Sequence, residues 1–264
     1  MRLKISHRTE YSYDAPVSYA LQRLRLTPQS GRTQTVQSWA VNVTGARQEV
    51  VFSDQFENET QLVSIEGDMQ SIVIEASGEV DTNNTAGVIG EHRGFAPLWL
   101  FRRETDLTKV GEGIKDLAAS IPAGSDLARL HGLMNVIEER VVYAKGTTHA
   151  GTSAEEALQL KTGVCQDHAH VFCAAARELG FSARYVSGYL MMDDTVHQAA
   201  SHAWAEAHVQ SLGWVAFDAS NGISPDERYI RVATGRDYRD AMPVSGIRMG
   251  WAEEQLAVSI TVEQ

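Results

Sequence analysis

The spacing of apolar side chains changes twice along this sequence, from a strand-like period to a helical one and back. Through residues 1–95, apolar and polar side chains alternate in short segments, as from Trp39 to Val43, and turn-forming residues separate these segments. Such alternation predicts strands, and we expect residues 1–95 to form a β-rich, β-sandwich-like domain. Helical spacings begin after Pro97, and strand-like segments return at Ala183. The order along the chain is therefore strands, then helices, then strands again.

Four segments after Pro97 repeat apolar residues at spacings of three and four, as an amphipathic helix does. They cover residues 107–117, 125–141, 153–160 and 165–179. Ser153 and Glu156 match a capping box, in which each side chain bonds a free N–H group at the start of a helix. Gly180 follows the last segment and offers the left-handed residue that often ends a helix. This last segment has the clearest helical pattern in the chain.

Strand-like segments follow over residues 183–190, 202–209 and 213–218, and residues 256–262 alternate as a closing strand. We expect the second and third of these segments to pair as a hairpin, with its turn at residues 210–213. Residues 81–94 are rich in Asp, Asn, Thr and Gly, which predicts a linker or a long loop.

The charge and the cysteine count exclude several classes of protein. The chain of 264 residues has 23 Lys and Arg against 34 Asp and Glu, a net charge of −11, so its average surface repels nucleic acid and anionic lipid. We expect neither as a partner. Two cysteines, Cys165 and Cys173, cannot form a disulfide framework or an all-cysteine zinc site, although either could be a nucleophile.

The first residues, MRLKISHRTEYSY, lack the apolar run of a signal peptide, and no apolar stretch approaches the length of a membrane span. A soluble, cytoplasmic, bacterial-type protein is the expectation, and export without a leader stays open.

Cys165 follows Gly163 and Val164 and opens the clearest helix. The free N–H groups and the positive dipole end of a helix start favour a thiolate, which is the nucleophilic form of cysteine. Cys165 also lies on the apolar stripe, so it faces the strands rather than solvent.

Strand arithmetic suggests which residues meet this thiol. If the hairpin turn is centred on residue 210 or 211, paired residue numbers sum to 420 or 422, and His202 lies opposite or diagonal to Asp218 on the same face. Cys165, His202 and Asp218 could then act as nucleophile, base and orienting acid.

Four motifs around these residues closely resemble the core of bacterial transglutaminase-like proteins, a superfamily that includes proteins described as cysteine proteases. They are Gly163-Val-Cys-Gln-Asp-His-Ala-His170, Gly180-Phe-Ser-Ala-Arg-Tyr-Val-Ser-Gly-Tyr189, Ser201-His-Ala-Trp-Ala-Glu206 and Gly213-Trp-Val-Ala-Phe-Asp218. Earlier motifs are similar to the N-terminal β-domain usual in that family: Tyr11-Ser-Tyr13, Leu24-Arg-Leu-Thr-Pro28 and Asp54-Gln-Phe-Glu-Asn58.

The resemblance implies an α+β fold of the papain-like, transglutaminase-core type, with an antiparallel sheet. It divides the chain into an N-terminal β-rich domain (1–95), a transglutaminase-like catalytic core (96–240) and a C-terminal segment with the closing strand (241–264). It also implies that Cys165, His202 and Asp218 are catalytic in a cysteine protease or amidase that needs no cofactor or metal. The expected partner is a peptide or protein substrate.

The resemblance leaves the reaction open. Hydrolysis of an amide bond through an acyl-enzyme, transfer of the acyl group to an amine as in a transglutaminase, and a non-catalytic protein-binding module that retains the triad all fit these motifs. The sequence also departs from the family at Asp218-Ala-Ser-Asn221, where Asp-Pro-Thr-Asn is common. Loss of the proline could alter the path of this loop without removing the carboxylate.

Other residues near these motifs have simpler interpretations. Cys173 lies deep in the helix, where packing is its expected role. His168 and His170 are two positions apart on a helix and point about 200° apart, so they cannot chelate one ion together. Trp204 is expected to form a wall of the cleft or part of the core, and Asp167 to cap the helix start rather than bind substrate.

Overall fold

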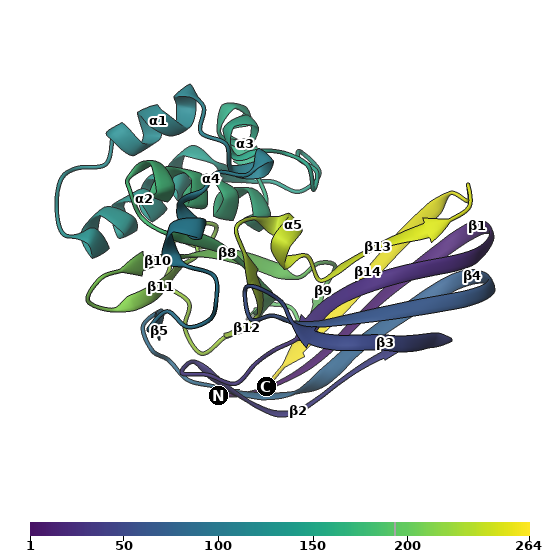
Figure 1. Ribbon diagram of the computed structural model, residues 1–264. Coiled ribbons are helices and arrows are strands. Elements are labelled where there is room, and N and C mark those ends of the chain that lie inside the picture. Colours follow the sequence, from purple (N-terminus) through teal and green to yellow (C-terminus); the bar gives the residue numbers. More distant parts are fainter. Residues whose placement is uncertain (193) are drawn as a thin grey trace.

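The structure, a computed structural model, describes residues 1–192 and 194–264 and contains two antiparallel sheets, with most of the helices gathered beside the smaller one (Figure 1). The larger sheet comprises β1 (Arg2–Thr27), β2 (Gln34–Val43), β3 (Ala46–Ser53), β4 (Glu59–Thr82), β9 (His197–Gln198), β13 (Val244–Met249) and β14 (Glu254–Glu263). The smaller sheet has the order β12 (Tyr229–Gly235), β8 (Ala183–Leu190), β10 (His202–Val209), β11 (Gly213–Phe217) and β5 (Val88–Gly90).

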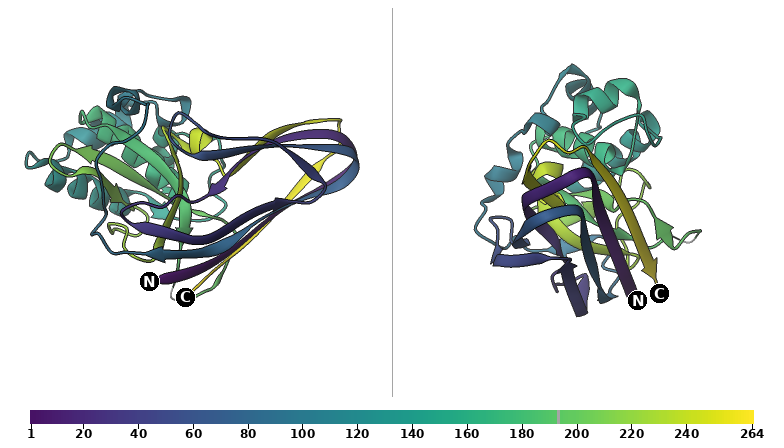
Figure 2. Two further views of the ribbon diagram at one scale, coloured as in Figure 1. Left: turned by 60° about the horizontal axis from the view of Figure 1, so that its bottom comes forward. Right: turned by 90° about the vertical axis from the view of Figure 1, so that its right-hand side faces the viewer.

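The larger sheet is folded over on itself. β2 and β3 lie end to end along β4, with Val43 opposite Ile74 and Ala46 opposite Ile65, and β13 and β14 lie end to end along β1. β1, β4, the β2–β3 stretch and the β13–β14 stretch all bend at the same height of the sheet. Register shifts interrupt the pairing of β1 with β4 there. Figure 2 shows the strands turning back there. The β-sandwich-like character that the sequence predicts therefore comes from two layers of one folded sheet.

Apolar side chains fill the space inside this fold. Ile72 and Ile74 from one arm of β4 and Val63 and Ile65 from the other belong to one buried cluster. Burial of a side chain of this size stabilises the folded state by about 1.5–3 kcal/mol. The two arms are thus held together by apolar side chains on the inner face of each strand. The alternation of apolar and polar residues in the sequence identifies this face.

The C-terminal strands belong to the N-terminal sheet. Ile5 of β1 is paired with Val262 of β14 on one side and with Gly78 of β4 on the other. The closing strand predicted at residues 256–262 is confirmed, within the longer β14. The domain boundaries after residues 95 and 240 remain predictions.

The helical part surrounds α4 (Cys165–Glu178), which contacts β8 and β10 of the smaller sheet. The other helices are α1 (Glu112–Ala119), α2 (Asp126–Arg140), α3 (Ala154–Leu160), α5 (Tyr238–Ala241) and the 3₁₀ turns η1 (Leu98–Arg102) and η2 (Asp106–Thr108). Ala203, Ala205 and Ala207 share a buried cluster with Phe172 and Cys173, so one face of β10 packs against α4. None of the helices in the described part of the chain is long and apolar enough to cross a membrane.

Most of the predicted elements around α4 agree with the structure. The helix at 165–179 and the strands at 183–190 and 202–209 are confirmed to within one residue, as is the capping box of Ser153 and Glu156. The helical stripe at 107–117 is interrupted, because the chain becomes extended at Lys109 and α1 begins only after Gly111, where Glu155 accepts hydrogen bonds from the N–H groups of Gly113 and Ile114.

The expectation that residues 81–94 form only a linker or loop was wrong. β4 continues through Thr82, and β5 pairs with β11, with Gly90 opposite Trp214 and Val88 opposite Val215. A strand of three residues is too short to show a period, and its position depends on a distant partner.

Two side-chain amides join the sheets at the free edge of β12. The Gln34 side chain accepts from the backbone N–H of Arg231 and donates to its carbonyl, both at 2.8 Å. Asn58 bonds the N–H and carbonyl of Thr234 in the same way, at 2.8 and 2.7 Å. Each amide thus takes the place of a neighbouring strand, so this edge does not stay unpaired.

Candidate active site

Cys165 is the first residue of α4, and its position is held by the residues around the helix start. Asp167 accepts hydrogen bonds from the backbone N–H of Val164 at 2.8 Å and from the Thr148 hydroxyl at 2.7 Å, both at Oδ2. The prediction that Asp167 caps this helix is confirmed. Cys165 is partly exposed, whereas Cys173 is fully buried, as its predicted packing role requires. Only the first of the two thiols is therefore open to a substrate.

His202 and Asp218 meet across the β10–β11 hairpin. The pairs run from Ala205 opposite Phe217 to Val209 opposite Gly213, a register whose residue numbers sum to 422, which is one of the two predicted values. In this register Asp218 lies diagonal to His202, and His202 Nε2 is 2.6 Å from Asp218 Oδ2. This bond occupies one ring nitrogen and leaves Nδ1 for another partner.

Asp218 is also held by three residues that the sequence analysis did not identify as part of the site. Asn221 donates to its Oδ2 at 2.7 Å and Tyr229 at 2.8 Å, while the Ser220 N–H and hydroxyl donate to its Oδ1 at 3.0 and 2.7 Å. Ser220 and Asn221 belong to the turn that lacks the family's proline, so hydrogen bonds to the carboxylate hold this turn. Sequence spacing could have suggested Asn221, but nothing in the sequence places Tyr229 here.

The pKa values show that this cluster stabilises opposite charges. Burial raises the pKa of Asp218, but the hydrogen bond and charge of His202, with the bonds from Asn221 and Ser220, outweigh it and lower the pKa to about 2. Burial lowers the pKa of His202, but the negative charge of Cys165 and the bond to Asp218 outweigh it and raise the pKa to about 10. The arrangement thus favours a His202 imidazolium paired with the Asp218 carboxylate.

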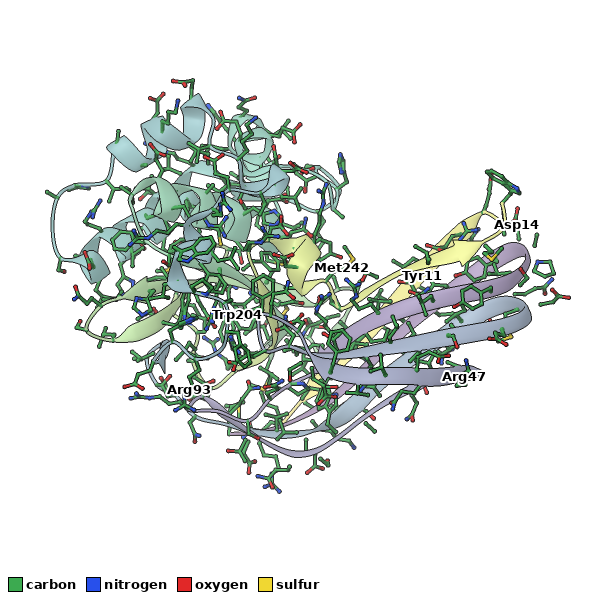
Figure 3. All side chains as sticks on the ribbon, in the orientation of Figure 1. Tyr11, Asp14, Arg47, Arg93, Trp204 and Met242 are labelled. Atoms are coloured by element: carbon green, nitrogen blue, oxygen red, sulfur yellow. The ribbon has the colours of Figure 1, made fainter. Side chains whose placement is uncertain are left out.

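Aromatic rings cover the His202–Asp218 pair. Trp204 stacks on the His202 ring at 6.2 Å between centroids, and the Tyr229 ring lies 5.9 Å away. Trp204 is buried in a small cluster on the face of the sheet away from α4, and Figure 3 labels it among the side chains around the smaller sheet. Its predicted role as a wall or core residue is confirmed. The rings shield the histidine–carboxylate bond from water, which strengthens it.

Tyr143 is a further residue near Cys165 that the sequence analysis missed. It lies in β6 (Val142–Tyr143), which pairs in parallel with β7 (Thr162–Gly163), so that Tyr143 is opposite Gly163. Its ring stacks on His168 at 6.3 Å. Burial and the negative charges of Cys165 and Asp218 raise the pKa of Tyr143. Its half-exposed phenol thus forms part of the surroundings of the thiol.

The two histidines of α4 contact different parts of the fold. Both ring nitrogens of His168 face backbone carbonyls, those of Val164 and Val141, each at 2.8 Å. His170 accepts from the backbone N–H of Tyr238 at 3.1 Å, and burial lowers its pKa to about 3. No group of three or more metal-binding side chains occurs among residues 1–192 and 194–264.

Comparisons with known proteins cover both halves of the chain. The family model described as "Transglutaminase-like superfamily" matches residues 115–219, and the model described as "Bacterial transglutaminase-like N-terminal region" matches residues 3–81. The uncharacterized protein ML0607 of Mycobacterium leprae is 28% identical over 279 residues, covering 99% of this chain and 98% of that protein. The uncharacterized protein Rv2569c of Mycobacterium tuberculosis is 28% identical over 273 residues, covering 93% of this chain and 87% of that protein.

Among solved structures, a "Putative Cysteine Protease" from Cytophaga hutchinsonii has a similar fold. The TM-score is 0.78 at 20% sequence identity, and the alignment covers 100% of this chain and 91% of that one. At this level of identity the similarity establishes a shared papain-like, transglutaminase-type fold and no more.

Proposed function

Because the chain belongs to the transglutaminase-like superfamily, we propose that it is a thiol-dependent hydrolase of amide or peptide bonds, with Cys165 as nucleophile, His202 as base and Asp218 as orienting acid. The observation that carries the proposal is the 2.6 Å bond from His202 Nε2 to Asp218 in a buried ring-lined site, beside a partly exposed cysteine at a helix start.

In the first half of the reaction, the Cys165 thiolate attacks the carbonyl carbon of the substrate. The carbonyl oxygen becomes negatively charged and accepts a hydrogen bond from the N–H of Cys165, one of the free donors at the start of α4. The His202 imidazolium gives its proton to the leaving nitrogen as the C–N bond breaks. A thioester and a free amine result.

In the second half, His202 removes a proton from water, the hydroxide attacks the thioester, and the thiolate leaves. An amine in place of water would complete a transglutaminase reaction by the same steps. We favour hydrolysis because water needs no second binding site. In both cases Asp218 stabilises the charged form of His202, as the carboxylate does in other triads.

Alkylation tests the nucleophile without a known substrate. We expect iodoacetamide at pH 6 to modify Cys165 at least about tenfold faster than a free cysteine, because the His202 imidazolium stabilises its thiolate. Peptide mapping by mass spectrometry identifies the modified residue, and the buried Cys173 serves as the internal control. His202→Ala should remove the acceleration. A rate at Cys165 equal to that of a free cysteine would instead support a binding module that only retains these residues.

A peptide library identifies the reaction. We expect incubation with the enzyme to yield products of hydrolysis that Cys165→Ala does not form. The same incubation with an amine donor such as cadaverine separates the two candidates, since amine-linked products would show acyl transfer. Absence of any acyl-enzyme on intact-mass analysis would contradict both.

A further inference from the structure

A cavity separate from the candidate active site lies where the turns of the larger sheet meet the edge of the smaller one. Its volume is about 500 Å³, within the range of small-molecule sites. The turn at residues 29–34, the turn at residues 56–58 and the segment from Ile89 to Arg93 form its walls, and Arg184, Trp214 and Arg231 complete its lining. Neither Cys165 nor His202 contributes to it.

The walls of this cavity are held in place by the fold. Gln34 and Asn58 both line it, and these are the two amides that bond the backbone of β12 at Arg231 and Thr234. The Asp54 carboxylate in turn accepts a hydrogen bond from the backbone N–H of Asn58 at 3.0 Å and forms an ion pair with the buried Arg25 at 2.8 Å. The cavity is therefore preformed, and the N-terminal motif from Asp54 to Asn58, which the proposed catalysis does not use, helps to build it.

The lining of the cavity carries an excess of positive charge. Arg184 and Arg231 share one carboxylate, that of the fully buried Glu206, at 2.6 and 2.9 Å, and Arg184 stacks on Trp214 at 4.0 Å. Two arginines and one glutamate leave a net charge of +1 on these residues. Arg231 uses Nε for this contact, its side chain is 27% exposed, and no partner for its terminal nitrogens occurs in the described part of the chain.

Two further arginines line the cavity from its rim. Arg32 and Arg93 are exposed, and neither has an ion pair within residues 1–192 and 194–264; Figure 3 labels Arg93. The exposed carboxylates of Glu57 and Glu91 also line the cavity and offset the charge of these two arginines. The four arginines against Glu57, Glu91 and Glu206 give +1 in total, in a protein whose net charge is −11. The cavity thus differs in sign from the average surface.

We propose that this cavity binds a small carboxylate-bearing molecule, whose carboxylate is bonded by the terminal nitrogens of Arg231. A planar guanidinium with two free nitrogens matches a carboxylate bidentately, and such charge-assisted bonds are among the strong ones. Arg32 and Arg93 attract the ligand at the rim. The site is independent of the proposed catalysis, although Glu206 lies on the same face of β10 as His202, about 13 Å along the strand.

Calorimetric titration with citrate tests the proposal. We expect saturable binding to the intact chain and none with trimethyl citrate, which has the same skeleton without the charges. Arg231→Gln should weaken citrate binding at least about tenfold, because it removes the bidentate partner. The surface variant Arg32→Gln/Arg93→Gln should weaken it about three- to tenfold; neither side chain has a hydrogen bond or ion pair to lose among the described residues. Arg140→Gln, at the end of α2, is the matched control and should not change the affinity.

Several outcomes would overturn the proposal. They are the absence of saturable heat with citrate, equal affinity for trimethyl citrate, and citrate affinities that are the same in Arg231→Gln, in the rim variant and in Arg140→Gln. A chain alkylated at Cys165 should bind citrate as the untreated chain does. Loss of binding on alkylation would place the citrate in the active site instead. Because this test measures binding alone, its result is independent of whether amide hydrolysis is found.

Discussion

Single residues decide the charge state of the proposed active site. The carboxylate of Asp218 accepts hydrogen bonds from the side chains of His202, Ser220, Asn221 and Tyr229, so it remains ionised although it is buried. Sequence reasoning identified His202 and Asp218 because they belong to adjacent strands with a computable register. It missed Tyr229 because β12 is paired with β8, and no local pattern places its hydroxyl beside Asp218.

The pKa shifts predict how stability depends on pH. The pKa of His202 is raised from 6.5 to about 10. Its contribution to the free energy of unfolding is therefore complete below about pH 6.5 and is lost as the pH rises through 10. The pKa of Asp218 is lowered from 3.8 to about 2, so its contribution is complete above about pH 3.8 and is lost as the pH falls through 2. Both contributions are therefore complete only between about pH 4 and 6.5.

We expect Asp218→Asn to destabilise the protein by about 3–5 kcal/mol in this window, since it leaves His202 without its buried partner. The difference between the two proteins should shrink toward pH 9.5 and toward pH 2.5. Urea unfolding at pH 2.5, 5.5 and 9.5 measures it. A difference that is constant across these values would show that the pair does not titrate as described.

At the scale of elements, α4 and the β10–β11 hairpin position the proposed nucleophile and base. Their bounds follow from local signals, namely the helical period, the left-handed Gly180 and the glycine at the hairpin turn, so the sequence predicted them closely. β5 and the break before α1 depend on contacts with β11 and with Glu155, which no local pattern contains.

The start of α4 offers a test at this scale. Thr148→Val removes the hydroxyl bonded to Asp167 but keeps the shape of the side chain, and we expect it to destabilise the protein by about 1 kcal/mol. Asp167→Ala, which also loses the bond from the Val164 N–H, should cost about 2 kcal/mol and slow alkylation of Cys165. Thermal unfolding and alkylation rates measure both effects. An unchanged alkylation rate in Asp167→Ala would show that the cap does not position the thiol.

At the scale of the whole molecule, the two sheets are joined by side chains at one strand edge. The sequence predicted a β-rich N-terminal part and a closing strand, but not that one sheet folds in half or that β13 and β14 complete it. The alternation of apolar and polar residues identifies which face of a strand is buried. It does not identify which other strand lies beside it.

The junction is testable through Asn58. Asn58→Ala removes both bonds to Thr234 and leaves a buried N–H and carbonyl unpaired, so we expect a loss of about 2–4 kcal/mol. Asn42→Ala, on an exposed position of β2, is the matched control and should change stability by less than about 0.5 kcal/mol. Urea unfolding compares the two variants. Equal losses would mean that the bonds of Asn58 do not hold the sheets together.

The pairing of β1 with β14 also has a consequence for how the protein is made. β1 leaves the ribosome well before residues 254–263, which form one of its neighbours in the sheet. Contacts between such distant residues form slowly, because a long loop must close first. An edge of β1 therefore stays open while the helices and the smaller sheet are synthesised, and the larger sheet can close only after residues 254–263 have followed them.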